Sequence, residues 1–379
     1  MIPYSRQFIT KKDIKNVKNV LLSNFLTTGP EIEKFEKKIK FFSNSKYATV
    51  VSSASAGLHI ACIALGLKKN DIVWTSPITF VSTASAALHC GARVDFVDID
   101  SKTFNICVNS LKAKLIKAKK DKKLPKIIIP VHLAGNPCEM KLIKKLSFKY
   151  KFKILEDASH AIGSKIGVNK IGNSKYSDAT VFSFHPVKII TTGEGGAILT
   201  NNSKIQFQVK RLREHGIERN IKNFKNKKKF PWYYEQQKLG FNYRLSDIHA
   251  SLGSSQLSQI KQFLNERNRL AKYYLRKLNL LKLDVQTVKS KNYSSYHLFI
   301  VLFPKHLRLK IFNELRKKNF YVNLHYIPVF YHPIFKNKFD LKQFPNSIDY
   351  YERAISLPLY PGLKLGEIDK VIKIINKFI

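Results

Sequence analysis

Short apolar segments recur along the first two thirds of the chain, and segments with helical spacing, such as 14–22 and 55–67, lie between many of them. Several of the apolar segments contain no polar residue, which is typical of strands buried on both faces. We expect strands at Tyr47–Val51, Ile72–Trp74, Arg93–Val97, Ile127–Val131, Lys153–Leu155, Ala179–Phe184 and Gly196–Thr200. The pattern predicts an α/β fold with a mostly parallel sheet covered by helices.

A long helical pattern runs from Leu245 to Leu278, with Leu257, Ile260 and Leu264 recurring on one side. The pattern after it is mixed, and we expect strands at 295–302 and 321–324 and helices at 307–317 and 365–378. The chain is therefore expected to divide into a large α/β domain and a smaller α+β domain. These domains would cover residues 1–250 and 251–379.

The charge of the chain is strongly positive. It carries 67 Lys and Arg residues against 26 Asp and Glu, a formal net charge of +41, which raises the alternative of a basic DNA-binding regulator. The basic residues are spread along the whole sequence, however, and the densest clusters, Lys117–Lys123 and Lys225–Lys229, are typical of solvated loops. No helix-turn-helix pattern accompanies them, so nucleic acid is not the partner that we expect. A basic surface also attracts small anionic substrates.

Apolar run length and cysteine spacing exclude two further classes. No apolar run reaches the roughly 18 to 20 residues that cross a bilayer, and the polar, lysine-rich start of the chain is not a signal peptide. We therefore expect a cytoplasmic protein with no membrane partner. No C-x-x-C spacing occurs, so we expect free thiols and no metal site at Cys62, Cys90, Cys107 and Cys138.

One lysine, Lys188, lies between the apolar pairs Pro186-Val187 and Ile189-Ile190, shortly after the strand expected at 179–184. A glycine-rich turn, Gly193-Glu194-Gly195-Gly196, follows it. In so basic a chain a solvated lysine is the ordinary interpretation. A lysine that is desolvated beside a strand end can instead lose its proton and act as a nucleophile, which makes Lys188 a candidate catalytic residue.

Three other segments carry polar groups in comparable places. Asp157 and His160 follow the strand expected at 153–155, where an Asp is either a helix N-cap or an active-site group. The segment 52–57 places small hydroxyl residues at a helix start, which is an ordinary N-cap or a phosphate site. Asn242 lies among aromatic residues before the long helix, where a plain loop with an N-cap at Ser246 is the alternative.

A nucleophilic lysine, an aspartate and a phosphate cradle are together what pyridoxal phosphate requires. The lysine attaches the cofactor, the aspartate keeps the pyridinium nitrogen protonated, and the cradle anchors the phosphate. From the residues alone, a pyridoxal phosphate enzyme is therefore one candidate. The apolar neighbours of Lys188 would help to desolvate its amine.

Many segments in the right order carry a resemblance to a known family. They include "LTTGPEIEKFE", "SPITFVSTASA", "VHLAGNP", "LEDASHAIGS", "FSFHPVKIITTGEGGA", "GFNYRLSDIHASLG" and "NLHYIPVF". With them the chain resembles the DegT/DnrJ-type sugar-nucleotide aminotransferases, a branch of the fold-type I (aspartate aminotransferase-like) pyridoxal phosphate enzymes. The resemblance implies a transaminase that uses pyridoxal 5'-phosphate and works as a homodimer with shared active sites.

The resemblance also implies roles for the residues around the cofactor. Lys188 would bond covalently to the cofactor, and Asp157 would pair with its pyridinium nitrogen. His160 would lie near the ring hydroxyl, and Phe80 would stack on the ring face. The phosphate would be held by Ala54, Ser55 and Ser183.

Two further implications concern the neighbouring subunit and the substrate. Asn242 would reach the phosphate from the other subunit, and His325 and Tyr326 would lie near the sugar nucleotide. The chain also departs from the family pattern, because many relatives carry Gln where this chain has His160. Some relatives carry His in place of the lysine and act as dehydratases, so Lys188 argues against that branch.

Within the family, "IPYSRQ", "LEDASHAIGS" and "GFNYRLSDIHASLGSSQL" most resemble members of the pseudaminic acid pathway. Those members aminate C4 of a UDP-linked 4-keto-6-deoxy-N-acetyl-hexosamine, with glutamate as the amino donor. A member that aminates C3, or a different 4-keto nucleotide sugar, stays open as the alternative.

Overall fold

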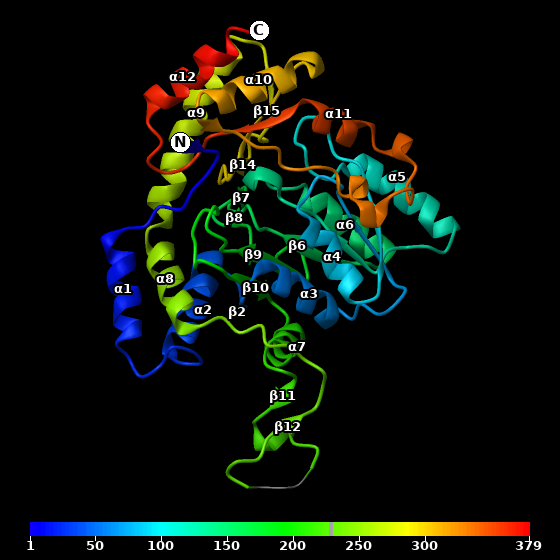
Figure 1. Cartoon of the computed structure of the whole chain (residues 1–379). Helices are drawn as coiled ribbons and strands as arrows, with labels where there is room; N and C mark the ends of the chain where they lie inside the picture. The colour runs from blue at the N-terminus through cyan, green and yellow to red at the C-terminus, as the bar shows by residue number, and fades with distance from the viewer. Residues whose placement is uncertain (227–229) are drawn as a thin grey trace.

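The seven strands expected in the first two thirds of the chain form one sheet in the computed structural model, which describes residues 1–226 and 230–379 (Figure 1). Across the sheet the order is β2-β10-β9-β6-β5-β3-β4. The bounds are β2 (Tyr47–Val51), β3 (Ile72–Thr75), β4 (Arg93–Phe96), β5 (Ile127–Ile129), β6 (Lys153–Asp157), β9 (Ala179–Ser183) and β10 (Gly196–Thr200). All neighbouring strands are parallel except the two pairs that β10 makes with β2 and β9. The predicted α/β fold is confirmed.

Helices cover both faces of this sheet. Val51 and Val181 pack on one face, against α3 (Ala54–Ala64), α4 (Val81–His89) and α7 (Ser203–Arg213). Their neighbours in sequence, Val50 and Phe182, pack on the other face, which is covered by α2 (Pro30–Ser43), α5 (Val108–Lys120), α6 (Met140–Tyr150) and α8 (Asp247–Ser258). Because successive side chains of a strand point to opposite faces, covering both faces requires apolar residues at every position.

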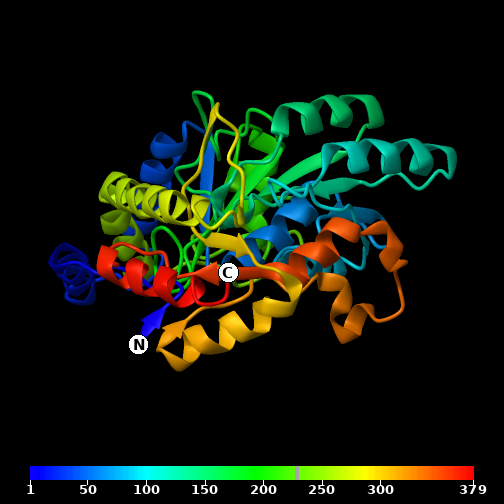
Figure 2. The same ribbon diagram turned by 90° about the horizontal axis from the view of Figure 1, so that it is seen from above.

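The C-terminal third of the chain forms a second core (Figure 2). Its antiparallel sheet, β13-β15-β17, packs against three helices. These elements are α9 (Ile260–Asn279), β13 (Asp284–Val285), β15 (Phe299–Leu302), α10 (Lys305–Lys317), β17 (Ala354–Leu357) and α12 (Leu365–Ile375). The start of the chain joins this part, because β1 (Ile2–Pro3) pairs in parallel with β16 (Phe320–Tyr321). The division into two domains at residue 250 stays a prediction.

Smaller elements complete the described structure. α1 (Lys11–Leu21) begins at a capping box between Thr10 and Asp13 and packs with α2 against α8. A hairpin of two short strands projects from the body beyond α7 (Figure 1). The remaining elements are β7 (Lys165–Ile166), β8 (Asn169–Lys170), β11 (Ile217–Glu218), β12 (Glu235–Gln236), β14 (Asn292–Tyr293) and α11 (Pro345–Arg353).

The single helix predicted over 245–278 is wrong, because α8 and α9 are separate helices that meet at Gln259. The Gln259 side chain donates hydrogen bonds to Asp13 Oδ1 (3.1 Å) and Ser255 O (3.3 Å) at this junction. Apolar spacing continues across the break, since Leu257 and Ile260 are both buried. The pattern of apolar positions therefore does not predict the boundary between the two helices.

The strand predicted at 295–302 begins only at Phe299. Ser295 is held elsewhere, because its N–H donates to Ser164 Oγ (3.0 Å) and its hydroxyl donates to His160 O (2.8 Å). These bonds attach the segment before β15 to the loop after β6. The apolar pattern predicted a longer strand because it carries no information about such contacts.

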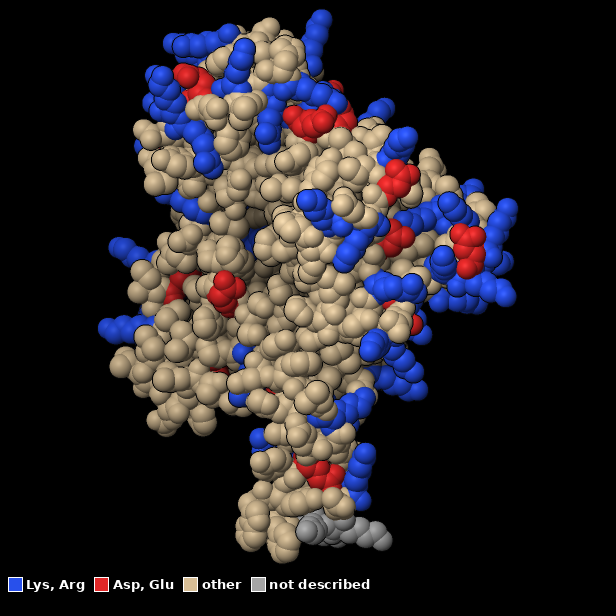
Figure 3. Space-filling view, turned by 45° about the vertical axis from the view of Figure 1, so that its right-hand side comes forward, with Lys and Arg blue, Asp and Glu red and all other residues tan. Residues whose placement is uncertain are grey.

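Basic side chains are dispersed among acidic ones over the face drawn in Figure 3. In the cluster Lys117–Lys123 every residue except Ala118 is exposed at the end of α5, as a solvated run should be. Of the second cluster, Lys225–Lys229, residues 227–229 lie outside the described part of the chain.

The four cysteines are free thiols in the structure; Cys62 and Cys138 are buried, and Cys90 and Cys107 are partly buried. Within 1–226 and 230–379, acidic, histidine and cysteine side chains form no group of three that could hold a metal ion. In the same residues, no helix has both the length and the apolar character that a membrane crossing requires.

Close packing at Gly253 of α8 generates the first prediction. A Cβ at this position would lie 2.6 Å from Thr192 Cγ2 and even closer to the ring of Phe35. We expect Gly253→Ala to lower the free energy of unfolding by about 1–3 kcal/mol, because the crowded neighbours must move. Gly366→Ala is the control, since no atom lies within 4 Å of its new Cβ. Urea titrations measure both variants, and equal stabilities would contradict the packing described.

Candidate active site

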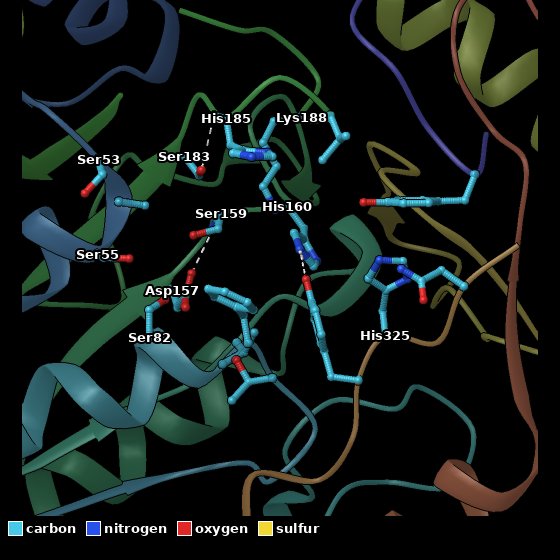
Figure 4. A pocket seen from close by; sticks show the side chains of 18 of the residues that line it. Ser53, Ser55, Ser82, Asp157, Ser159, His160, Ser183, His185, Lys188 and His325 are labelled. Atoms are coloured by element: carbon cyan, nitrogen blue, oxygen red, sulfur yellow. Dashed lines mark hydrogen bonds between the residues drawn. The ribbon is translucent and has the colours of Figure 1, made fainter. Parts of the chain in front are cut away.

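A cavity of about 590 Å³ lies at the carboxyl ends of the sheet strands, where open α/β sheets bind ligands. Figure 4 shows side chains from separate elements around it. Ser53 and Ser55 lie on one side and His325 on the opposite side, with Asp157 and His160 between them. Nine of the ten predicted site residues line this cavity: Ala54, Ser55, Phe80, Asp157, His160, Ser183, Lys188, His325 and Tyr326.

Lys188 reaches the cavity from the loop between β9 and β10. Its backbone N–H donates to His185 O (2.9 Å), and the next residues, Ile189 and Ile190, are buried in the core. These two side chains anchor the loop and leave the Lys188 amine at the cavity wall. Burial of the amine lowers the pKa of Lys188 to about 8, and the negative charge of Asp157 opposes this shift.

Asp157 is the last residue of β6 and is buried beside the cavity. Thr83 Oγ1 donates to its Oδ2 (2.7 Å), and the Ser159 N–H donates to its Oδ1 (3.1 Å). The carboxylate is therefore held in one orientation. It is not a helix N-cap, which was the alternative open from the sequence, since the loop after β6 leads into no helix.

The neighbouring acid, Glu156, points to the other face of the sheet. Its Oε2 lies 2.8 Å from His132 Nε2, and Thr180 Oγ1 and Ser177 donate to its Oε1. These buried partners hold Glu156 away from the cavity. The alternation of side chains along β6 separates the two acids, so only Asp157 is available to a ligand.

The start of α3 forms a cradle of backbone N–H groups. Ser53 is its N-cap and accepts the Ala56 N–H (3.1 Å). Ala54 and Ser55 line the cavity, and their N–H groups have no partner inside the helix. A helix start with free N–H groups binds phosphate well. The Ser183 hydroxyl lines the same cavity.

Gly196 brings this cradle and the lysine loop together. It pairs with Val51 on one side and Ser183 on the other. A Cβ on Gly196 would lie only 2.7 Å from Ala54 N, so no other residue lets β10 approach the start of α3 so closely. Gly196 thus allows the start of α3 and the loop that carries Lys188 to lie close together.

Aromatic side chains form the remaining wall. Phe80 is the N-cap residue of α4 and is 55% exposed, and its ring centroid lies 6.0 Å from that of Tyr326. The His325 ring is 4.6 Å from that of Tyr4, and its Nδ1 lies 2.8 Å from Ser356 Oγ. Burial lowers the pKa of His325 to about 3, and the charge of Lys188 adds to the effect, so this imidazole is neutral.

Asn242 is the one predicted site residue that the chain does not bring to its own cavity. It is exposed and pairs with Glu214 in an isolated bridge. The N-cap expected at Ser246 is present, because its Oγ accepts the His249 N–H (3.3 Å).

Sequence reasoning missed several residues that also line the cavity. They are Tyr4, Ser53, Thr79, Ser82, Ser159, His185, Glu194 and Asn323. Ser53 and Ser159 adjoin predicted site residues, so proximity in the sequence is a signal that could have found them. Tyr4 and Asn323 arrive through the pairing of β1 with β16, which no local pattern indicates.

The chain belongs to the DegT/DnrJ/EryC1/StrS aminotransferase family, whose profile matches residues 7–376. An uncharacterized protein of Methanocaldococcus jannaschii is 37% identical, covering 100% of this chain and 97% of the relative. The UDP-4-amino-4,6-dideoxy-N-acetyl-beta-L-altrosamine transaminase of Campylobacter jejuni serotype O:23/36 is 36% identical, covering 97% of this chain and 94% of that enzyme.

Solved structures share the fold along the whole chain. A putative sugar aminotransferase of Streptococcus pneumoniae, Spr1654 in its PMP-form, has a TM-score of 0.90 at 26% identity, covering 100% of this chain and 98% of that one. Helicobacter pylori PseC, an aminotransferase of pseudaminic acid biosynthesis, has a TM-score of 0.86 at 30% identity, covering 99% and 98%.

These findings and the geometry agree on the class of enzyme. The protein is a pyridoxal-phosphate-dependent transaminase that acts on sugars. Its cavity fits the cofactor, since it combines an amine of lowered pKa, an oriented carboxylate and a helix start with free N–H groups. Lys188 is among the residues that line this cavity.

The lowered pKa of Lys188 generates the second prediction. The amine loses its proton as pH rises through about 8, so its reaction with acetic anhydride in the cofactor-free protein should reach half its plateau near that pH. The side chain of N-acetyl-lysine amide, with a pKa of about 10.4, is the reference. Asp157→Asn removes the opposing negative charge and should move the midpoint lower.

Mass spectrometry of the Lys188 peptide, with labelling at several pH values, gives both midpoints. A wild-type midpoint near that of the reference compound would show that the amine is solvated. A midpoint that rises in Asp157→Asn would show that this carboxylate does not act on Lys188.

Proposed function

We propose that this transaminase moves an amino group from glutamate to C4 of a UDP-linked 4-keto-6-deoxy-N-acetyl-hexosamine, as a step in pseudaminic acid biosynthesis. The observation that carries this proposal is the similarity to the Campylobacter jejuni altrosamine transaminase over nearly the full length of both chains. The similarity to Helicobacter pylori PseC, an aminotransferase of pseudaminic acid biosynthesis, supports the same pathway.

The cavity residues have distinct tasks in binding the cofactor. Ala54, Ser55 and Ser183 hold the phosphate, because the helix start and the hydroxyl provide donors on one side of the cavity. Asp157 keeps the ring nitrogen protonated, since Thr83 and Ser159 fix the carboxylate as an acceptor. Phe80 covers one face of the ring.

Lys188 is the group that moves protons. Pyridoxal phosphate, when bound, supplies a carbonyl carbon that exchanges the amino group and a ring that takes up electrons. With a pKa near 8, the Lys188 amine is partly neutral at physiological pH, so its Nζ can take a proton from Cα of glutamate. The same Nζ then returns a proton on the other side of the transfer. The two substrates use one site in turn, which predicts ping-pong kinetics.

The third prediction tests the substrate. Purified protein with pyridoxal phosphate, glutamate and the UDP-linked 4-keto-6-deoxy-N-acetyl-hexosamine should release 2-oxoglutarate and a sugar aminated at C4, as shown by NMR of the product. A panel of other keto nucleotide sugars, including 3-keto sugars, should react much more slowly. Faster turnover of another member of the panel would assign that substrate instead.

Lys188→Ala is the matched variant for this assay. It should reduce turnover by at least about 10²- to 10⁴-fold, the usual contribution of a general acid–base group, while the protein stays folded. Lys34→Ala, at an exposed lysine of α2, is the control and should keep the wild-type rate. Full turnover in Lys188→Ala would refute the role given to this amine.

We also propose that the active enzyme is a homodimer in which Asn242 serves the partner's site. Asn242 is exposed in the single chain, although the family resemblance implies a role for it at the cofactor phosphate. Large apolar side chains are exposed on α1 and the loop after it: Ile14, Leu21, Leu22, Phe25 and Leu26. This loop lies against the start of α8, because the Asp247 N–H donates to Leu26 O (3.0 Å). So large an exposed apolar group is typical of a surface that another chain covers.

The fourth prediction uses hybrid dimers of Lys188→Ala and Asn242→Ala chains. If Asn242 acts across the interface, each hybrid contains one site with both wild-type residues, and mixing the two weak variants should restore activity. If Asn242 acts in its own chain, no site is intact and the mixture should stay as weak as its parts. Light scattering of the wild-type protein measures the mass of the assembly directly.

A further inference from the structure

Both ring nitrogens of His160 are engaged by the protein itself. The Ala134 backbone N–H donates to Nδ1 (3.2 Å), and Nε2 lies 3.0 Å from the Tyr326 hydroxyl. Figure 4 shows the second bond as the dashed line that leaves His160 toward the side with His325. Both residues line the cavity, where His160 is buried and Tyr326 is partly buried.

The bond from Ala134 decides which nitrogen carries the proton. A backbone amide can only donate, so Nδ1 of His160 must offer a lone pair. A neutral imidazole then carries its hydrogen on Nε2. Nε2 therefore donates, and the Tyr326 oxygen accepts.

The surroundings keep the ring in this neutral form. The His297 ring packs 4.3 Å from that of His160, and Lys188 and His325 face the same group. Burial lowers the pKa of His160 well below its usual value, and the charge of Lys188 acts in the same direction. No carboxylate contributes to the shift, so nothing favours a second proton on the ring.

The consequence concerns the hydroxyl hydrogen of Tyr326. In the described part of the chain, His160 is the only protein group that bonds to this hydroxyl. Since the oxygen accepts from His160, its own hydrogen is free to point into the cavity. Burial raises the pKa of Tyr326, so the phenol keeps this hydrogen.

We infer that His160 is a positioning residue that acts through Tyr326: the relay from Ala134 through His160 makes the Tyr326 hydroxyl a hydrogen-bond donor to an oxygen of the bound ligand. That oxygen belongs either to the cofactor ring or to the keto group of the sugar. The inference rests on the cavity being the transaminase site. It separates His160 from direct contact with the ring hydroxyl, the role that the family resemblance implies.

The first experiment reads the proton position without turnover. In cofactor-free protein labelled with ¹⁵N-histidine, a protonated and an unprotonated ring nitrogen resonate far apart, and His160→Gln assigns the signal. We expect the Nε2-protonated tautomer at neutral pH. An Nδ1-protonated or a doubly protonated ring would overturn the relay.

The second experiment is a double-mutant cycle on the half-reactions with glutamate and with the keto sugar. Tyr326→Phe removes one hydrogen bond and should slow the affected half-reaction by about 3- to 30-fold. His160→Leu breaks the relay and should cost a similar factor, and the double variant should cost no more than Tyr326→Phe alone. His160→Gln, whose amide can both accept from Ala134 and donate to Tyr326, should stay within about threefold of the wild type.

Tyr274→Phe is the matched control, because it removes a buried hydroxyl that has no partner in the described structure and lies in the C-terminal core. It should leave both half-reactions unchanged. Multiplicative losses in the double variant, or no effect of Tyr326→Phe on either half-reaction, would overturn the proposal. The loss of activity in Lys188→Ala tests the proposed transaminase site and does not depend on His160 or Tyr326. The relay can therefore fail while the proposed site stands, and the two failures give different results.

The absorbance spectrum of the bound cofactor, measured without sugar, shows whether the oxygen that accepts from Tyr326 belongs to the cofactor or to the sugar. If Tyr326→Phe changes that spectrum or its pH dependence, the Tyr326 hydroxyl donates to the cofactor ring oxygen. If the spectrum is unchanged and only the half-reaction with the keto sugar slows, the hydroxyl donates to the sugar. Either result supports the donor role.

Discussion

The desolvated amine of Lys188 is the group on which the rest of the site depends. An ordinary lysine holds its proton at neutral pH and cannot attack a carbonyl or take a proton from carbon. Burial brings the pKa of Lys188 to about 8, and the charge of Asp157 limits how far it falls. The loop between β9 and β10 achieves this because Ile189 and Ile190 anchor it in the core.

The direction of β10 explains how distant segments come to surround that amine. β10 runs against its neighbours, so the loop that carries Lys188 lies at the same sheet edge as the end of β6 and the start of α3. Gly196 stands at the crossing, paired with Val51 and Ser183 and almost touching Ala54. A parallel strand would have carried the chain away from this edge before returning.

Hydrogen bonds with a fixed direction complete the arrangement. Asp157 only accepts, from Thr83 and Ser159, which leaves it oriented toward the cavity. His160 accepts a hydrogen bond from the Ala134 N–H at Nδ1 and donates one from Nε2 to the Tyr326 oxygen. In a buried site, the direction of these hydrogen bonds decides which ligand groups fit, because leaving a buried donor or acceptor without a partner costs free energy.

Local pattern determined a large share of this protein. Strands buried on both faces are largely apolar, so most strands of the sheet stood out in the sequence, and the edge strand β4, with Arg93 and Asp95, was also predicted. The glycine-rich turn after Lys188 marked the central loop. The break at Gln259 and the late start of β15 were not visible, because polar contacts with distant residues, not apolar spacing, set them. Only the tertiary structure decided which partners hold Glu156 away from the cavity, that Tyr4 and Asn323 reach it through β1 and β16, and that the Lys188 amine is buried. Burial and hydrogen-bond direction depend on groups far apart in the chain, and no local pattern contains them.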